Sequence, residues 1–164
     1  MNAPVSVYLS AGSNIEPARH LRAAVAALRE RYGALRLSPV YRSAPVGFAG
    51  QDFLNLVVGF ETSEQPAEIM RFLESLHRRA GRDRSGGRLS SHSLDLDLLL
   101  YGDLVSDEPP LPRDDILEYA FVLAPLADLA PNLEHPVSGR RIGELWAAFD
   151  KAQPPLKRID LDLG

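Results

Sequence analysis

The chain has 164 residues, no cysteine and a formal net charge of −4. This length fits one domain over residues 1–164, the missing thiols exclude disulfides and thiolate metal sites, and the acidic balance argues against a general nucleic-acid binder. No window reaches the roughly 18 apolar residues of a membrane span, and no signal-peptide pattern is present. We therefore expect no membrane partner and a cytoplasmic location, and the sequence identifies no protein partner.

The first half of the chain alternates between strand and helix patterns. Apolar alternation predicts strands at 5–11, 35–41 and 53–61, and the first strand is predicted to stop at a turn, 12–14. A Pro/Gly loop, 44–50, separates the second strand from the third. Helical spacing of apolar residues predicts a helix at 17–32 and another that begins at 63 or 64, with Pro66 in its first turn.

The second half begins with a strand at 95–101, which is predicted to end in a hairpin turn, 101–103, leading into 104–105. A proline-rich loop, 107–112, precedes a helix at 119–129, interrupted or restarted at Pro125, and a short helix at 142–149. From 153 onward we expect a loosely packed tail, with an edge strand at 158–162 as the alternative. The order of elements predicts an α+β domain whose mostly antiparallel sheet is covered by helices on one face.

The strand at 95–101 carries two carboxylates inside an apolar run. Because strand side chains alternate between faces, Asp95 and Asp97 point to the same side. Two neighbouring negative charges are costly to bury unless a positive charge lies between them, and hard oxygen ligands suit Mg²⁺ bound together with substrate phosphates. Taken alone, the pattern equally fits a half-exposed edge strand with two solvated carboxylates.

A glycine-rich loop with three arginines leads directly into this strand. Arg82, Arg84 and Arg88 lie within eight residues that also contain three glycines. An arginine cluster of this kind is often only a solvated surface. Its position directly before the Asp95 strand favours the metal interpretation of the carboxylate pair.

With these residues in view, the chain resembles the 6-hydroxymethyl-7,8-dihydropterin pyrophosphokinase family over about residues 5–135. The similarity rests on ordered segments at family-like spacings: Ala11–Asn14, Tyr41–Gly47, Gln51–Asn55, Gly81–Arg84, Ser93–Gly102 and Phe121–Leu126 followed by Ala130-Pro131. The resemblance implies a ferredoxin-like α+β fold, Mg²⁺-dependent transfer of diphosphate from ATP to a pterin alcohol, two Mg²⁺ ions, and loops that close over both substrates.

The resemblance also implies roles for individual residues. Asp95 and Asp97 match the metal ligands, and the residues matched to the catalytic positions are Arg82, His92, Asp95, Asp97 and Arg113. The residues matched to the ATP side are His77, Arg82, Arg84, Arg88, His92, Leu98 and Arg113. The residues matched to the pterin side are Ser43, Ala44, Pro45, Val46, Phe53, Asn55, Asp95 and Phe121. Without the family, Phe53 and Phe121 would be read as core residues.

The departures from the family pattern lie mainly on the ATP side. His92 stands where the family usually has Arg, Arg113 where it has His, His77 where it tends to have Glu, and Tyr119 where it has a later Arg. Segment 89–93 also lacks the usual aromatic-Gly-Pro-Arg-Thr sequence. An imidazole is mostly neutral at pH 7, whereas a guanidinium stays charged, so Arg113 is a candidate to replace the charge lost at His92.

Three hypotheses stay open at this point. The chain is a pterin diphosphokinase with a diverged loop, or a paralog of the same fold that acts on another pterin-like or small alcohol or phosphate acceptor. The third is a non-catalytic ligand-binding homologue. The intact carboxylate pair argues against the third, because a like-charge pair has little structural reason to be present without a cation.

Overall fold

The computed structural model describes residues 3–45, 49–81, 94–150 and 155–164. Its elements in chain order are β1 (Val5–Ser13), α1 (Pro17–Tyr32), β2 (Arg36–Leu37), β3 (Val40–Ser43), β4 (Phe53–Thr62), α2 (Pro66–Arg79), β5 (Asp95–Tyr101), β6 (Ser106–Asp107), β7 (Pro110–Leu111), α3 (Asp115–Glu118), α4 (Ala120–Leu129), α5 (Ile142–Ala147) and β8 (Lys157–Ile159). None of the described helices is both long and apolar enough to cross a membrane.

The main sheet is antiparallel at every strand pair and runs in the order β5-β1-β4-β3-β8, with β2 also paired to β4. The path β1-α1-β3-β4-α2-β5, with β1 and β4 at the centre, is the ferredoxin-like arrangement. The predicted α+β, mostly antiparallel fold class is therefore confirmed.

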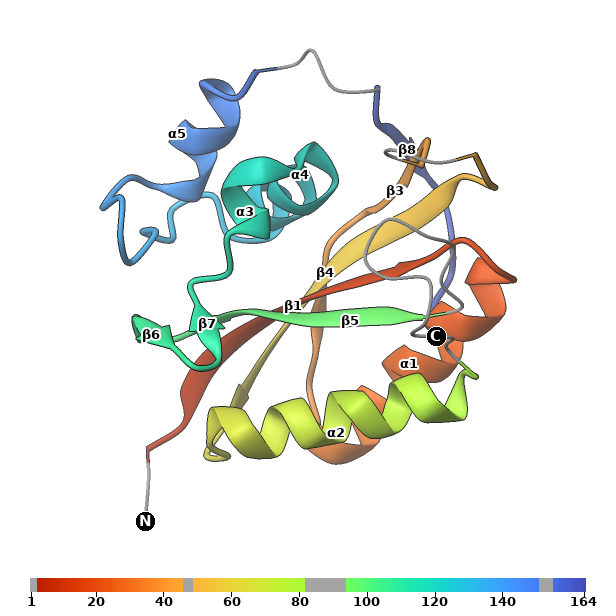
Figure 1. Cartoon of the computed structure of the whole chain (residues 1–164), viewed down its shortest axis with the longest axis horizontal. Helices are drawn as coiled ribbons and strands as arrows, with labels where there is room; N and C mark the ends of the chain where they lie inside the picture. The colour runs from red at the N-terminus through yellow and green to blue at the C-terminus, as the bar shows by residue number, and fades with distance from the viewer. Residues whose placement is uncertain (1–2, 46–48, 82–93, 151–154) are drawn as a thin grey trace.

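Helices pack on both faces of this sheet, so the expectation of one covered face was wrong. Helices α1 and α2 lie on one side, and α3, α4 and α5 lie on the other (Figure 1). Val7 and Leu9 pack with the first pair, whereas Tyr8 and Val57 pack with the second group. The central strands are apolar on both faces, which is typical of a sheet buried between two helical layers. The functional residues described below lie on the α4 face.

Two strand predictions in the first half differ from the structure. β1 continues through Gly12 and Ser13, where a turn was expected, because all nine of its residues pair with β4. The single strand expected at 35–41 is divided into β2 and β3 at Ser38-Pro39. Pro39 has no N–H for the ladder, and the Ser38 hydroxyl instead accepts a hydrogen bond of 2.8 Å from the Val57 N–H.

The predicted turn after β5 is present, since the Leu104 N–H donates to the Tyr101 carbonyl at 3.1 Å. Residues 104–105 form no strand, and the expected loop at 107–112 is instead largely the β6–β7 hairpin. α4 runs through Pro125 without a break, because its buried apolar surface outweighs the loss of one helical hydrogen bond. α2 begins at Pro66 and is preceded by a capping box, in which Gln65 and Glu68 hydrogen-bond to each other's backbone. α5 ends at Ala147, two residues before its predicted end.

The C-terminal tail is tied to the domain rather than loosely packed. β8 extends the sheet beyond β3, which confirms the edge-strand alternative with bounds of 157–159. Leu163 is buried in the core under α1. The guanidinium groups of Arg22 and Arg29 donate to the carbonyls of Asp162 and Gly164 at 2.8 and 2.9 Å. The tail therefore runs from the edge of the sheet to α1.

Candidate active site

A row of aligned residues crosses five strands on the α4 face of the sheet. In β1, Gly12 pairs with Asp95 of β5 on one side and with Asn55 of β4 on the other. Asn55 in turn pairs with Tyr41 of β3, which pairs with Arg158 of β8. Neighbouring strands lie about 4.8 Å apart, so Asp95 and Asn55 are on the order of 10 Å apart across the bare backbone of Gly12. The row therefore places a carboxylate and a buried amide on either side of a residue that has no side chain.

Asp95 and Asp97 point away from the core that contains Leu96 and Leu98, and both carboxylates are half-buried. Within the described ranges, no group of three or more His, Cys, Asp or Glu side chains could hold a metal ion. A site with two protein carboxylates is completed by other oxygen ligands, which is how Mg²⁺ binds together with substrate phosphates. The residues present therefore fit a substrate-bound Mg²⁺ rather than a metal enclosed by protein ligands alone.

Arg113 brings a positive charge to this carboxylate pair. Its terminal nitrogen Nη2 lies 3.5 Å from Asp97 Oδ1, and its Nε lies 3.1 Å from Asp115 Oδ1. The Nε–H is not aligned as a hydrogen bond despite the short distance, so the contact with Asp115 is held by charge. The Arg113 N–H donates to the Leu99 carbonyl at 3.0 Å and fixes the residue against β5. A guanidinium is thus positioned beside Asp97, where phosphate charge would collect.

Asn55 is buried, and its side-chain amide donates to the Ser43 hydroxyl at 3.3 Å. A Cβ at Gly12 would lie 2.5 Å from Asn55 Oδ1, so the missing side chain at Gly12 is what allows Asn55 its present position. Ala44 is exposed and Pro45 half-buried, directly beyond the end of β3. The predicted polar contact at Asn55 and the start of segment 43–46 are therefore neighbours.

The two aromatic residues predicted for the pterin side lie on β4 and at the start of α4. Phe53 faces the same side of β4 as Asn55, since the two are separated by one residue, and it pairs with Ser43. Phe121, in the first turn of α4, stacks on Tyr119 with ring centroids 4.9 Å apart and planes 23° apart. Both Phe53 and Phe121 are half-buried rather than enclosed in the core. A partly open ring near a fixed amide, as Phe53 is to Asn55, suits recognition of a flat, hydrogen-bonding heterocycle.

Several residues expected at the site lie outside the part of the chain that the structure describes: Val46, Arg82, Arg84, Arg88 and His92. Their predicted roles stay predictions. Leu98 is described, but its side chain is buried in the core on the α2 side, so only its backbone faces β1.

His77, predicted on the ATP side, lies on the α2 face of the sheet and not beside Asp95 and Asp97. Its Nε2 accepts a 2.8 Å hydrogen bond from the N–H of Leu96, and its Nδ1 lies 3.3 Å from Glu74 Oε2. Among the described strands β5 pairs only with β1, so the Leu96 N–H points to the open edge. His77 therefore supports from behind the strand that carries the carboxylate pair.

Replacing His77 by Leu is expected to lower the free energy of unfolding by about 1–3 kcal/mol, because the buried Leu96 N–H would lose its acceptor. The measurement is urea unfolding followed by circular dichroism. His77→Gln is the matched control, because its amide oxygen can accept the same hydrogen bond and should restore part of the loss. Equal destabilisation by both variants would contradict this role.

No site role was predicted for Gly12, Asp115 or the Tyr41–Arg158 pairing. The first strand was predicted to end at 11, two residues before its observed end at Ser13, and period-two alternation over 5–13 puts Gly12 on the same face as Asn55 and Asp95. Asp115 and Arg158 depend on contacts between distant segments, for which the local pattern carries no signal.

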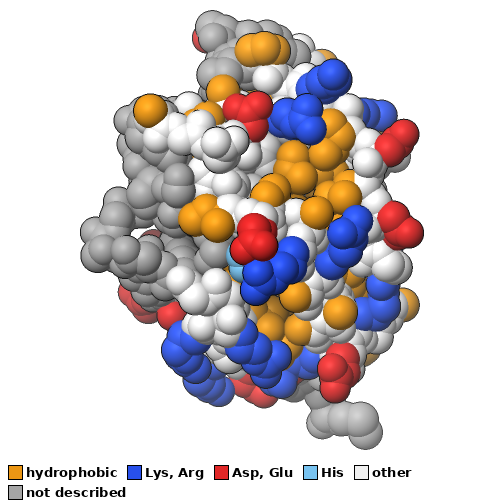
Figure 2. Space-filling view, turned by 90° about the vertical axis from the view of Figure 1, so that its right-hand side faces the viewer, with side chains coloured by type: hydrophobic (Ala, Val, Ile, Leu, Met, Phe, Trp, Pro, Cys, Tyr) orange, Lys and Arg blue, Asp and Glu red, His pale blue; other side chains and the backbone are white. Residues whose placement is uncertain are grey.

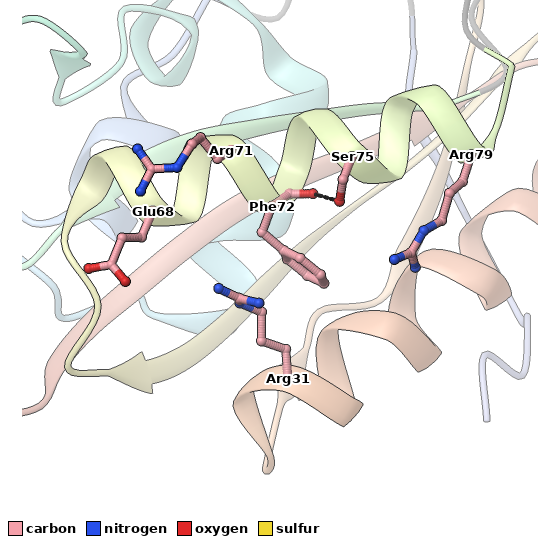
Figure 3. A pocket seen from close by; sticks show the side chains of 6 residues that line it. All are labelled: Arg31, Glu68, Arg71, Phe72, Ser75 and Arg79. Carbon is pink, nitrogen blue, oxygen red and sulfur yellow. Dashed lines mark hydrogen bonds between the residues drawn. The ribbon is translucent and has the colours of Figure 1, made fainter.

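A separate hollow of about 370 Å³ lies on the helical layer of α1 and α2, away from this row. Figure 3 shows Arg31 and Arg79 reaching toward the Phe72 ring from different sides, with Glu68 and Arg71 nearer the start of α2. Arg31 is already paired with Glu64 at 2.6 Å. Figure 2 shows Lys and Arg side chains on the right-hand face of the molecule, with Asp, Glu and apolar side chains between them.

Comparison with known proteins gives a family-model match and several named relatives. Residues 8–131 match the family model described as 7,8-dihydro-6-hydroxymethylpterin-pyrophosphokinase (HPPK). A protein of Pseudomonas aeruginosa named 2-amino-4-hydroxy-6-hydroxymethyldihydropteridine pyrophosphokinase is 42% identical over 149 residues, covering 87% of this chain and 90% of its own. A Bacillus subtilis protein of the same name is 33% identical over 133 residues, covering 77% and 79%.

Among solved structures, the wild-type HPPK-DHPS of Plasmodium falciparum with pteroate superposes with a TM-score of 0.73 at 12% identity. That match covers 90% of this chain but 44% of the solved chain, so the chain spans under half of that protein and the likeness concerns the fold. The family match and the bacterial relatives decide the assignment. The chain belongs to the 7,8-dihydro-6-hydroxymethylpterin-pyrophosphokinase family.

Proposed function

We propose that this protein transfers a diphosphate group from ATP to 6-hydroxymethyl-7,8-dihydropterin, a step of folate biosynthesis, in the cytoplasm, where ATP is supplied. The observation that carries the proposal is the row in which Asp95 and Asn55 flank the bare backbone of Gly12. It joins a carboxylate pair suited to metal-bound phosphates with a fixed amide suited to a heterocycle edge. Family membership supports the same substrates.

At the β-phosphorus of ATP the reaction makes one bond and breaks one, and the alcohol also loses its proton. The alcohol oxygen of the pterin bonds to the β-phosphorus of ATP, and the bond from that phosphorus to the oxygen bridging it to the α-phosphate breaks. AMP leaves with the electron pair, and the alcohol proton passes to solvent. Catalysis of this kind depends mainly on positioning and on stabilising charge on the phosphate oxygens.

Each part of the site has a proposed role in the transfer. Asp95 and Asp97 would hold Mg²⁺, for which we propose two ions, and bound Mg²⁺ supplies Lewis-acid stabilisation of phosphate charge. Arg113 adds a fixed cation beside Asp97. Asn55, the backbone of 43–46, Phe53 and Phe121 would orient the pterin ring so that its alcohol faces the phosphates. Arg82, Arg84, Arg88 and His92 would bind the ATP phosphates.

The test is a product assay that follows AMP release from ATP and Mg²⁺ with and without 6-hydroxymethyl-7,8-dihydropterin. We expect AMP and pterin diphosphate in equal amounts only when both substrates are present. Binding of both substrates without AMP release would point to a non-catalytic homologue. AMP release with another alcohol but not with this pterin would point to a different acceptor.

Activity is expected to depend on Arg113 more than on His92 at neutral pH. A guanidinium stays charged and binds phosphate through a planar fork, whereas an imidazole with an ordinary pKa near 6.5 is mostly neutral at pH 7. The measurement is kcat/KM for ATP in Arg113→Ala and His92→Ala at pH 7 and pH 6. We expect the larger loss for Arg113→Ala, and a His92→Ala effect that grows at pH 6, where the wild-type imidazole gains its proton. Equal and small losses would mean that neither side chain faces ATP.

A further inference from the structure

Arg158, in the C-terminal strand, joins three separate elements. Its Nε donates to the Tyr41 hydroxyl oxygen of β3 at 3.0 Å, and its Nη2 lies 2.6 Å from Asp128 Oδ1 of α4. The Tyr41 hydroxyl donates to the other oxygen of Asp128. The three side chains therefore close a triangle that links β8, β3 and α4.

The Tyr41 hydroxyl is fixed as a donor in this triangle. Tyr41 is buried, and burial raises its pKa, with the hydrogen bond to Asp128 acting in the same direction. Arg158 itself is exposed, so its ion pair is expected to contribute little to the stability of the whole domain. Its effect should therefore lie in local geometry rather than in folding.

The linked elements are the two walls of the proposed pterin pocket. Tyr41 pairs with Asn55 in the sheet, and Ser43, two residues further along β3, accepts the hydrogen bond of Asn55. Asp128 follows Phe121 by seven residues in α4, so both lie on one side of the helix, about 10 Å apart along its axis. A tilt or rotation of α4 against β3 would therefore move Phe121 relative to Asn55.

We propose that Arg158 is a positioning residue for the pterin pocket. Through Tyr41 and Asp128 it holds α4, which carries Phe121, in place against the strands that carry Asn55 and Ser43. This inference rests on the proposed function. It assigns the C-terminal strand, which lies beyond the residues matched by the family model, a role in acceptor binding. Asp95 and Asp97 do not contact Arg158, Tyr41 or Asp128 in any described interaction. ATP binding is therefore not expected to depend on Arg158.

The test compares Arg158→Ala, Arg158→Lys and Arg22→Ala with the wild type. Arg22 ties the same tail to α1 through the Asp162 carbonyl, far from α4, so Arg22→Ala is the control for general loosening of the tail. Pterin affinity is measured by calorimetric titration with Mg²⁺ and a non-hydrolysable ATP analogue present. Affinity for the analogue is measured separately, and circular dichroism melts check folding.

We expect Arg158→Ala to weaken pterin binding by about three- to ten-fold, the size of coupling through a neighbouring contact, with affinity for the ATP analogue unchanged. The KM for pterin should rise more than kcat falls. Arg158→Lys should lie between Arg158→Ala and the wild type, because it keeps the charge but not the forked geometry. Arg22→Ala should bind pterin like the wild type.

Unchanged pterin affinity in Arg158→Ala would overturn the inference. An equal loss in Arg22→Ala, or a parallel loss of affinity for the ATP analogue, would also overturn it by showing a general loosening. If Arg158→Ala does not fold, Arg158→Lys and Arg158→Gln provide the same comparison. A wild type that fails to bind the pterin would instead refute the proposed function, so the two failures are distinguishable.

Discussion

Replacing Asp95 or Asp97 by Asn is expected to abolish diphosphate transfer while leaving the fold intact. Each change removes a negatively charged oxygen ligand without changing the volume of the side chain. Electrostatic groups at such sites contribute on the order of a hundred- to a thousand-fold in rate, so we expect a loss of at least about a hundred-fold in kcat/KM. Both carboxylates are half-buried at the surface of the sheet, so the core beneath them should not be disturbed.

The two variants should differ in one respect. Asp97 pairs with Arg113, so Asp97→Asn leaves that guanidinium with Asp115 alone, whereas Asp95→Asn leaves the Arg113 contacts in place. Asp103→Asn is the matched control, because Asp103 is exposed in the turn directly after β5. The measurement is AMP release as a function of Mg²⁺ concentration, together with thermal unfolding. Near-full activity of either site variant at ordinary Mg²⁺ would refute the proposed metal role.

The sequence predicted the orientation of the carboxylate pair better than the arrangement of the helical layers. Alternation within a strand depends on the backbone alone, so the shared orientation of Asp95 and Asp97 followed directly from their spacing. The second helical layer was missed because strands such as β4 are apolar on both faces, and a continuous apolar run does not show which helices will cover each face.

Residues that depend on pairing between distant segments could not be predicted in the same way. Arg158 meets Asp128 only because β8 adds to the sheet beyond β3, and a short strand near the chain end carries a weak local signal. His77 was assigned to ATP by analogy, although its position on α2 turns it toward the edge of β5. The packing of segments that are far apart in the sequence, rather than residue type, decides these cases.

Gly12→Ala is expected to weaken pterin binding as strongly as removal of the Asn55 side chain. A Cβ at Gly12 would lie 2.5 Å from Asn55 Oδ1, a distance that forces the amide to rotate away from its present position. Asn55 would then lose its hydrogen bond to Ser43 and its alignment with the ring edge. A buried polar partner left unsatisfied costs about 1–3 kcal/mol, which corresponds to a roughly ten-fold or greater loss of pterin affinity for Asn55→Ala.

Combining the two changes tests whether Gly12 acts through Asn55. If the new Cβ only displaces the amide, then Gly12→Ala should add little in an Asn55→Ala background, so the double variant should bind pterin no more weakly than Asn55→Ala. Gly59→Ala is the control, since its Cβ would meet the Tyr8 ring at 3.0 Å inside the same sheet, away from Asn55. Pterin affinity is measured by titration with Mg²⁺ and an ATP analogue present. Fully additive losses would show that Gly12 contacts the ligand itself. The absence of a side chain at Gly12, and not the position of the Asn55 amide, would then be what pterin binding requires.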